Sequence, residues 1–273
     1  MSIYAMLQGT AETDAQTTRS ALAMAQMLKR PLVGLCALPD PQSALMVVAT
    51  PESAGISAAA TQSIIELQKD MLAAAEGAFK SVAGAAAGSF VHQVATAESA
   101  AASAATLADA VVFPRGAASN SEPLSVAFDH VMMDARLPLV LDGKKPYAPG
   151  PMVIGWDGSD GAARAVRMHA PLIEAAEEVI VAQNRKDAER DGIRPSIALE
   201  SLADWLKARN VKARTEHFEG EVAAGLLSLA KASGATLIVC GAYGHSRLGE
   251  RLFGGTSKRL LGADGAPALA LAR

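Results

Sequence analysis

The 273-residue sequence has only two cysteines, no dense run of lysine or arginine, and no long apolar stretch. Cys36 and Cys240 each lie inside an apolar segment, which argues against a disulfide framework and fits a reducing compartment. A net charge of −3 and a pI near 6.0 argue against nucleic-acid or anionic-membrane partners, because proteins that bind these carry a basic patch. The first residues lack a signal-peptide pattern, and no apolar run approaches the roughly 20 residues of a membrane span. We therefore expect a cytoplasmic protein.

Two catalytic patterns are also missing. The chain has no Gly-x-x-x-x-Gly-Lys-Ser/Thr phosphate loop, and no cysteine or carboxylate near His245 has the spacing of a metal site. We expect no catalytic residue and no metal site built from side chains.

What the sequence does contain is one order of elements repeated twice. The Pro/Gly-rich stretch 142–151 has little capacity for regular structure and separates the repeats. A length prior of roughly 100–200 residues per domain also favours two domains. We predict domains at residues 1–143 and 151–273.

Alternating hydrophobic patterns predict strands and helices in turn, and hence an α/β fold with mostly parallel sheets covered on both faces. The expected strands of the first half are 3–8, 32–38, 90–95, 110–113 and 137–141, with helices near 14–29, 59–82 and 98–107. Those of the second half are 152–156, 179–183, 211–217, 236–240 and 268–272, with helices from 159 to about 176, from about 195 to 210, over 221–233 and after 257.

Polar and glycine residues of the second half follow its predicted strands. Asp157 follows the first strand, Gln183 ends the second, and the segment 241–257 follows the fourth. Ligands bind at the carboxyl ends of parallel strands, so these segments should meet in one crevice.

The segment after the fourth strand has the character of a phosphate cradle. Glycines allow sharp turns and close approach of the backbone to a ligand, and a Gly-Gly-Thr-Ser run before a helix offers free N–H groups to an anion. The residues are Gly241, Gly244, Gly254, Gly255, Thr256 and Ser257. Turn glycines without a ligand are the alternative interpretation, and Asp157 is as well suited to cap a helix as to bind a ligand.

The first half lacks this chemistry. Gly9-Thr10-Ala11 stands where the second half has Asp157-Gly158-Ser159, and Pro114-Arg115-Gly116 follows its fourth strand without a later glycine pair. We expect the first half to keep the fold and to have lost the site.

The spacing Gly241-x2-Gly244-x9-Gly254, together with the strand 152–156 and Asp157, resembles the ATP-binding pattern of the universal stress protein family in its tandem two-domain form. This resemblance implies two open five-stranded sheets of the adenine-nucleotide alpha-hydrolase-like type, with strand order 3-2-1-4-5. The sequence departs from the family pattern at Gly255, where the pattern has Ser or Thr. The nucleotide-binding residues that it implies are Trp156, Asp157, Val181, Ala182, Gln183, Gly241, Gly244, His245, Gly254, Gly255, Thr256 and Ser257.

The resemblance implies a regulator of stress response or energy status that binds ATP, ADP or AMP, with or without Mg²⁺, in its second half. The implied partners are this nucleotide, an unidentified regulatory protein, and a second copy or the other half of the chain paired through the last strands. Two alternatives stay open: a slow ATP hydrolase, and an interaction module that needs no nucleotide.

Overall fold

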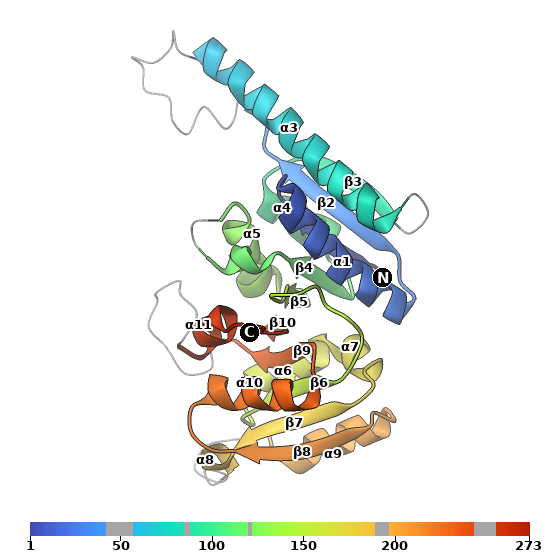
Figure 1. The fold of residues 1–273 in the computed structure, drawn as a ribbon, viewed down its shortest axis with the longest axis vertical. Coiled ribbons are helices and arrows are strands. Elements are labelled where there is room, and N and C mark those ends of the chain that lie inside the picture. The colour runs from blue at the N-terminus through green and yellow to red at the C-terminus, as the bar shows by residue number, and fades with distance from the viewer. Residues whose placement is uncertain (42–56, 85–87, 120–121, 189–196, 243–254) are drawn as a thin grey trace.

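The computed structural model describes residues 1–41, 57–84, 88–119, 122–188, 197–242 and 255–273 (Figure 1). Its first half alternates strands and helices as the hydrophobic pattern predicts. The elements are β1 (Ile3–Leu7), α1 (Ala11–Leu28), β2 (Leu32–Leu38), α3 (Ser57–Ala83), β3 (Gly88–Val94), α4 (Ala97–Ala104), β4 (Ala110–Phe113), a 3₁₀ turn (Arg115–Ala118), α5 (Ser125–His130), a π-helical turn (Val131–Ala135) and β5 (Leu139–Leu141).

The second half repeats the alternation. Its elements are β6 (Met152–Trp156), α6 (Asp160–Met168), α7 (Ala170–Glu174), β7 (Val179–Asn184), α8 (Arg185–Ala188), α9 (Leu199–Ala208), β8 (Ala213–Phe218), α10 (Val222–Ser233), β9 (Leu237–Gly241), α11 (Gly255–Gly262) and β10 (Ala268–Ala272).

All ten strands form one sheet, in the order β3-β2-β1-β4-β5-β10-β9-β6-β7-β8. Within each half the order is the predicted 3-2-1-4-5, and the pairing is parallel. The two halves meet at β5 and β10, which pair antiparallel with Val140 opposite Ala270. The prediction that the last strands join the halves as an intrachain pseudo-dimer is therefore confirmed (Figure 1).

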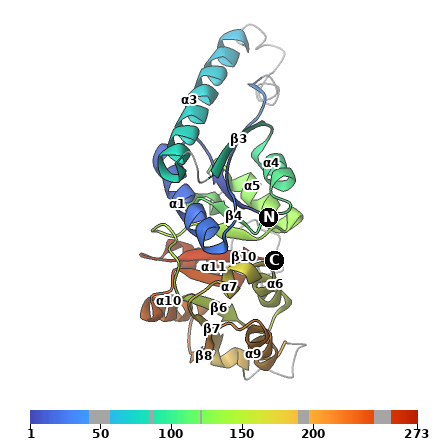
Figure 2. The ribbon, with the colours of Figure 1, turned by 90° about the vertical axis from the view of Figure 1, so that its right-hand side faces the viewer.

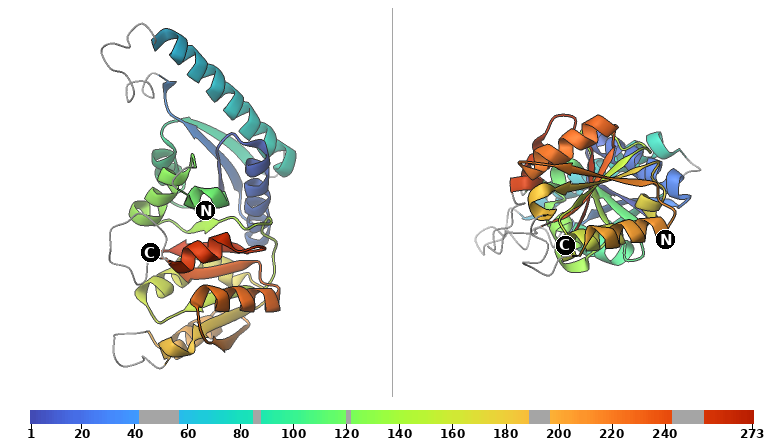
Figure 3. Two further views of the ribbon diagram at one scale, coloured as in Figure 1. Left: turned by 60° about the vertical axis from the view of Figure 1, so that its left-hand side comes forward. Right: turned by 90° about the horizontal axis from the view of Figure 1, so that it is seen from below.

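Helices cover both faces of this sheet, as Figure 3 shows. One face packs against buried side chains of α1, α3, α6, α7 and α9, and the other against those of α4, α5, α10 and α11. Because both faces are covered, the central strands are buried on each side and read as continuous apolar runs. β9 and β10 are examples, with Leu237 and Leu269 fully buried.

The structure differs from the expected elements in several places, among them the short helix α8 (Arg185–Ala188), where no helix was expected. The single helix expected from 159 to about 176 is two helices, since Pro171 cannot donate a backbone hydrogen bond and its ring crowds the carbonyl four residues earlier, and α6 ends at Met168. No helix was expected between β4 and β5, although Phe128, Val131 and Met132 of α5 and the π-helical turn are buried there. The apolar spacing of these three residues was the available signal.

Helix α3 has 27 residues and extends past the edge of the sheet, as Figures 1 and 2 show. Over the residues that the structure describes, no helix combines the length and the hydropathy that crossing a bilayer requires.

Candidate functional site

The candidate site lies at the carboxyl ends of β6, β7 and β9, which are neighbours in the sheet. Trp156 at the end of β6 pairs in register with Gln183 of β7, and on the other side β6 pairs with β9, whose last residue is Gly241. The fold thus brings Asp157, Gln183 and Gly241 to one edge, although 84 positions separate the first from the last (241 − 157).

Asp157 starts a tight turn that leads into α6. Its Oδ1 accepts the backbone N–H of Ser159 at 3.0 Å, and the Ser159 hydroxyl caps α6 by accepting the N–H of Ala162 at 3.2 Å. Gly158 between them has φ = 70°, a conformation that side chains disfavour. Asp157 is half-buried, and its carboxylate supports the turn. Ser159, rather than Asp157, is thus the residue that caps α6.

Gly241 is the point where β9 touches the start of α6. A Cβ at this position would lie 2.7 Å from the carbonyl carbon of Gly161 and 2.8 Å from the nitrogen of Ala162. Both are backbone atoms that cannot move aside, so only glycine permits this approach. Close helix–strand packing at a nucleotide edge is one established use of glycine in doubly wound folds.

Four of the residues that the resemblance implies for nucleotide binding lie on two faces of the sheet. Trp156 and Val181 pack in the core cluster on the α6 and α9 side, and the register puts Gln183 beside Trp156 on the same side. Ala182 lies on the opposite side among residues of α10. Ala182 can therefore meet a ligand at that edge only through its backbone. The Trp156 indole N–H is buried and finds no acceptor in the described part of the chain.

The remaining predicted residues belong to the segment before α11 and to its first turn. Gly244, His245 and Gly254 lie outside the described residues. Gly255, Thr256 and Ser257 form the start of α11, whose first backbone N–H groups have no partner within the helix. These groups and the helix dipole favour an anion at this end.

Two residues at this edge were not predicted from the sequence. Glu221 caps α10 by accepting the N–H groups of Ala223 and Ala224 at 3.0 and 2.9 Å, and it pairs with Arg259 of α11 at 3.4 Å. Asn184, the buried last residue of β7, donates to the carbonyl of Gly220 at 3.0 Å. A capping residue before an apolar helix was the signal for Glu221. No local pattern identifies Asn184, because its partner is 36 residues away.

The electrostatics of the site follow from burial. Burial, with the negative charge of Asp157 nearby, raises the pKa of Cys240 to about 12, so this thiol is unreactive at neutral pH. Burial alone would raise the pKa of Glu221, but its hydrogen bonds from Ala224 and Ala223 and the charge of Arg259 lower it below its usual value. The described residues include no group of three side chains arranged to hold a metal ion.

At the equivalent edge of the first half, the turn after β1 is covered by side chains, and a pocket of about 250 Å³ remains between the start of α1 and the ends of β4 and β5. The fully buried Asp14 carboxylate accepts the backbone N–H groups of Gln8 and Gly9 at 3.0 and 2.9 Å. Above this turn Met71 of α3 approaches so closely that a Cβ on Gly9 would lie 2.5 Å from the Met71 Cβ. The backbone N–H groups of Gln8 and Gly9 are thus already satisfied.

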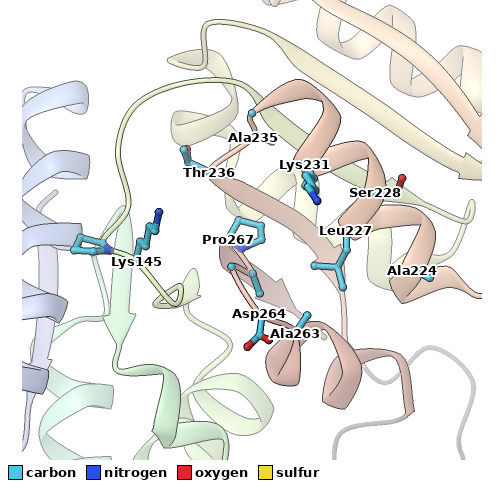
Figure 4. Close-up of a pocket in the computed structure, with 15 residues that line it drawn as sticks. Lys145, Ala224, Leu227, Ser228, Lys231, Ala235, Thr236, Ala263, Asp264 and Pro267 are labelled. Carbon is cyan, nitrogen blue, oxygen red and sulfur yellow. The ribbon is translucent and has the colours of Figure 1, made fainter.

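A cavity of about 680 Å³ lies at the opposite ends of the strands (Figure 4). Thr236, which precedes β9, and Pro267, which precedes β10, line it together with Lys231 of α10 and Lys145 of the connecting segment. Ligands of open α/β sheets bind at the carboxyl ends, and this cavity is at the amino ends. It contains none of the predicted site residues.

This sheet order, with helices on both faces, defines a doubly wound α/β fold of the adenine-nucleotide alpha-hydrolase-like class. Residues 150–263 match the model of the Universal stress protein family. The second half thus matches the universal stress protein family, and the first half repeats the fold of the second.

Solved structures agree with this assignment of the fold. A universal stress protein from Archaeoglobus fulgidus DSM 4304 is 11% identical, with a TM-score of 0.60 over 100% of this chain and 98% of its own. A putative universal stress protein from Pseudomonas aeruginosa UCBPP-PA14 is 13% identical, with a TM-score of 0.52 over 99% of this chain and 92% of its own. At these identities the likeness concerns the fold alone.

A universal stress protein solved in complex with cAMP is 22% identical, with a TM-score of 0.38 over 45% of this chain and 97% of its own. None of the curated proteins compared with the chain matches it.

Proposed function

We propose that residues 151–273 form a domain that binds ATP or a related adenine nucleotide, and that residues 1–143 form a structural partner domain without this site. The nucleotide acts as a ligand through which the protein reports energy status or stress to a regulatory partner. The observation that carries the proposal is that β6 and β9 are paired neighbours whose carboxyl ends place Asp157 and Gly241 at one edge of the sheet, where Gly241 packs against the start of α6.

The difference between the halves supports one site rather than two. In the second half Asp157 is half-buried and its carboxylate supports the turn before α6, whereas in the first half the Asp14 carboxylate is fully buried. A bound nucleotide needs both space and polar groups that face it. The first edge has Met71 in that space, so the proposed stoichiometry is one nucleotide per chain.

We expect Asp157→Asn to weaken ATP binding about tenfold, since it removes a charge that can accept ligand hydroxyl groups, a loss of about 1.4 kcal/mol. The amide oxygen of asparagine can still accept the Ser159 N–H, so the turn should persist. Calorimetric titration of the wild type and the variant with ATP, ADP and AMP, with and without Mg²⁺, measures the effect and ranks the ligands.

The matched control is Ser228→Ala, an exposed position lining the cavity of Figure 4 at the other end of the strands. It should leave the affinity unchanged. Absence of any heat from the wild type at millimolar ATP, together with no nucleotide released when fresh protein is denatured, would reject nucleotide binding and favour an interaction module.

Slow hydrolysis is the second candidate function, and the same crevice would serve it. Steady-state phosphate release that persists through purification and disappears in Gly254→Val would favour an enzyme. We expect no such release, because the sequence contains no phosphate-loop lysine and the described residues offer no carboxylate set for Mg²⁺.

A further inference from the structure

Arg115 crosses from the first half to the helix that starts at the proposed nucleotide edge. Its Nε donates to the carbonyl of Leu261 at 2.8 Å, and its Nη2 donates to the carbonyl of Leu260 at 2.9 Å and also to that of Leu261. Its Nη1 donates to the carbonyl of Asp142 at 3.2 Å. The guanidinium thus binds the last turn of α11 while remaining attached to the end of β5.

These carbonyls belong to the C-terminal turn of α11, where backbone acceptors have no partner inside the helix. A cation at this end also complements the helix dipole. Burial lowers the pKa of Arg115, but an arginine pKa is so high that the side chain stays charged at neutral pH. Arg115 therefore acts as a C-terminal cap supplied by the other half of the chain.

Helix α11 depends on such outside contacts, because it has only eight residues and short helices are unstable on their own. Other contacts that hold α11 include the packing of Leu260, which is 1% exposed, and the ion pair of Arg259 with Glu221. Any nucleotide phosphate at the first turn and Arg115 at the last turn would both favour the helical state. Two ligands of one conformational state bind with positive coupling.

Arg115 also occupies an informative position in the repeat. It follows β4, the fourth strand of the first half, just as the Gly241 segment follows β9, the fourth strand of the second. The first half has no glycine pattern after β4. At this position the side chain of Arg115 instead reaches α11 across the junction of the two halves.

We infer that Arg115 is a positioning residue for the proposed site: the first half holds α11 in its helical form and thereby sets the nucleotide affinity of the second half. This inference rests on the proposed function for its ligand. The apparent affinity of a site is proportional to the fraction of molecules in the binding-competent state. Releasing α11 lowers this fraction and should therefore weaken binding.

The first test needs no nucleotide. Hydrogen exchange of the α11 amides should be about tenfold or more faster in Arg115→Met than in the wild type, with Arg115→Lys in between because an ammonium donates without the planar fork. The matched control is Arg30→Met, which breaks the 2.8 Å ion pair with Asp109 inside the first half and touches no residue of α11. Unchanged α11 exchange in Arg115→Met would overturn the inference.

The second test is calorimetric titration with ATP. Arg115→Met should bind about tenfold more weakly, Arg115→Lys should recover part of the loss, and Arg30→Met should bind like the wild type even if its melting temperature falls. A loss of affinity common to both methionine variants would point to general destabilisation and reject the positioning role. A wild type that binds no ATP would instead refute the proposed function, and the exchange experiment would still decide whether Arg115 holds α11.

Discussion

At the scale of single residues, Gly241 at the end of β9 lies directly against backbone atoms at the start of α6. Replacing it with alanine would bring a Cβ to 2.7 Å from the Gly161 carbonyl carbon, which forces the strand and the helix apart. We expect Gly241→Ala to lower the free energy of unfolding by about 1–3 kcal/mol, the usual cost of overpacking. Urea denaturation measures this difference directly.

Gly77 provides the matched control for that substitution. It lies in α3, and a Cβ at this position would have no neighbouring atom within 4 Å. Gly77→Ala should raise the free energy of unfolding by about 0.5–1 kcal/mol, because alanine loses less chain entropy in a helix. Equal effects of the two substitutions would mean that β9 and α6 are not in close contact.

At the scale of elements, His169 connects the break between α6 and α7 to β5 of the first half. Its Nδ1 lies 2.9 Å from the Ala165 carbonyl oxygen and its Nε2 lies 3.1 Å from that of Leu139. The ring is fully buried, and a neutral imidazole has one N–H, so it can donate to only one of the two carbonyls. Burial keeps the pKa of His169 below its usual 6.5, although both hydrogen bonds oppose this shift.

This lowered pKa predicts a loss of stability in acid. The unfolded chain binds a proton at His169 as the pH falls through about 6.5, while the folded chain does not until lower pH. The contribution of His169 is therefore complete above pH 6.5 and decreases below it. We expect His169→Gln to remove this dependence, so that the difference in unfolding free energy between wild type and variant shrinks from pH 7 to pH 5.

The pH dependence of stability that Asp142 contributes has the opposite sign to that of His169. The effect of His169 is therefore measured as a difference between the variant and the wild type. Burial raises its pKa to about 6, against hydrogen bonds from Ser20, Gln16 and Gly143 and the charge of Arg115, so its protonation favours the folded state as the pH falls from 6 towards 4. His217→Gln, at an exposed position of β8, is the control and should give a curve parallel to the wild type. A parallel curve for His169→Gln would contradict the prediction.

At the scale of the whole molecule, the two halves share one sheet through three residue pairs of β5 and β10. Val140 and Ala270 face each other there with no exposed surface. Because apolar contacts of both halves are buried at this junction, we expect the chain to unfold in a single calorimetric transition. Two separated transitions in the wild type would mean that the halves unfold independently.

Val140→Ala tests the junction directly. Removing buried methyl groups should cost about 2 kcal/mol and lower the melting temperature of the single transition by roughly 4 °C or more. Val126→Ala makes the same chemical change at a site that is 62% exposed, and should alter the unfolding free energy by no more than about 0.5 kcal/mol. Equal shifts for the two variants would exclude a special role of the junction.

The sequence by itself determined the alternation of strands and helices, the parallel sheets and the edge at which Asp157 and Gly241 lie. These follow from local hydrophobic patterns and from the rule that parallel strands end at the same edge. The break at Pro171 and the burial of Phe128 were also readable from local chemistry. Helices α5 and α8 were not predicted from the sequence.

Only the tertiary structure decided the contacts between distant segments. Met71 covers the turn at Gly9, Asn184 reaches Gly220, and Arg115 holds α11 across the junction. These contacts join residues 36 to 146 positions apart, and no local propensity or spacing encodes such a pairing. The physical reason is that packing of whole helices and strands, rather than the local chain, brings these side chains within hydrogen-bonding or van der Waals distance.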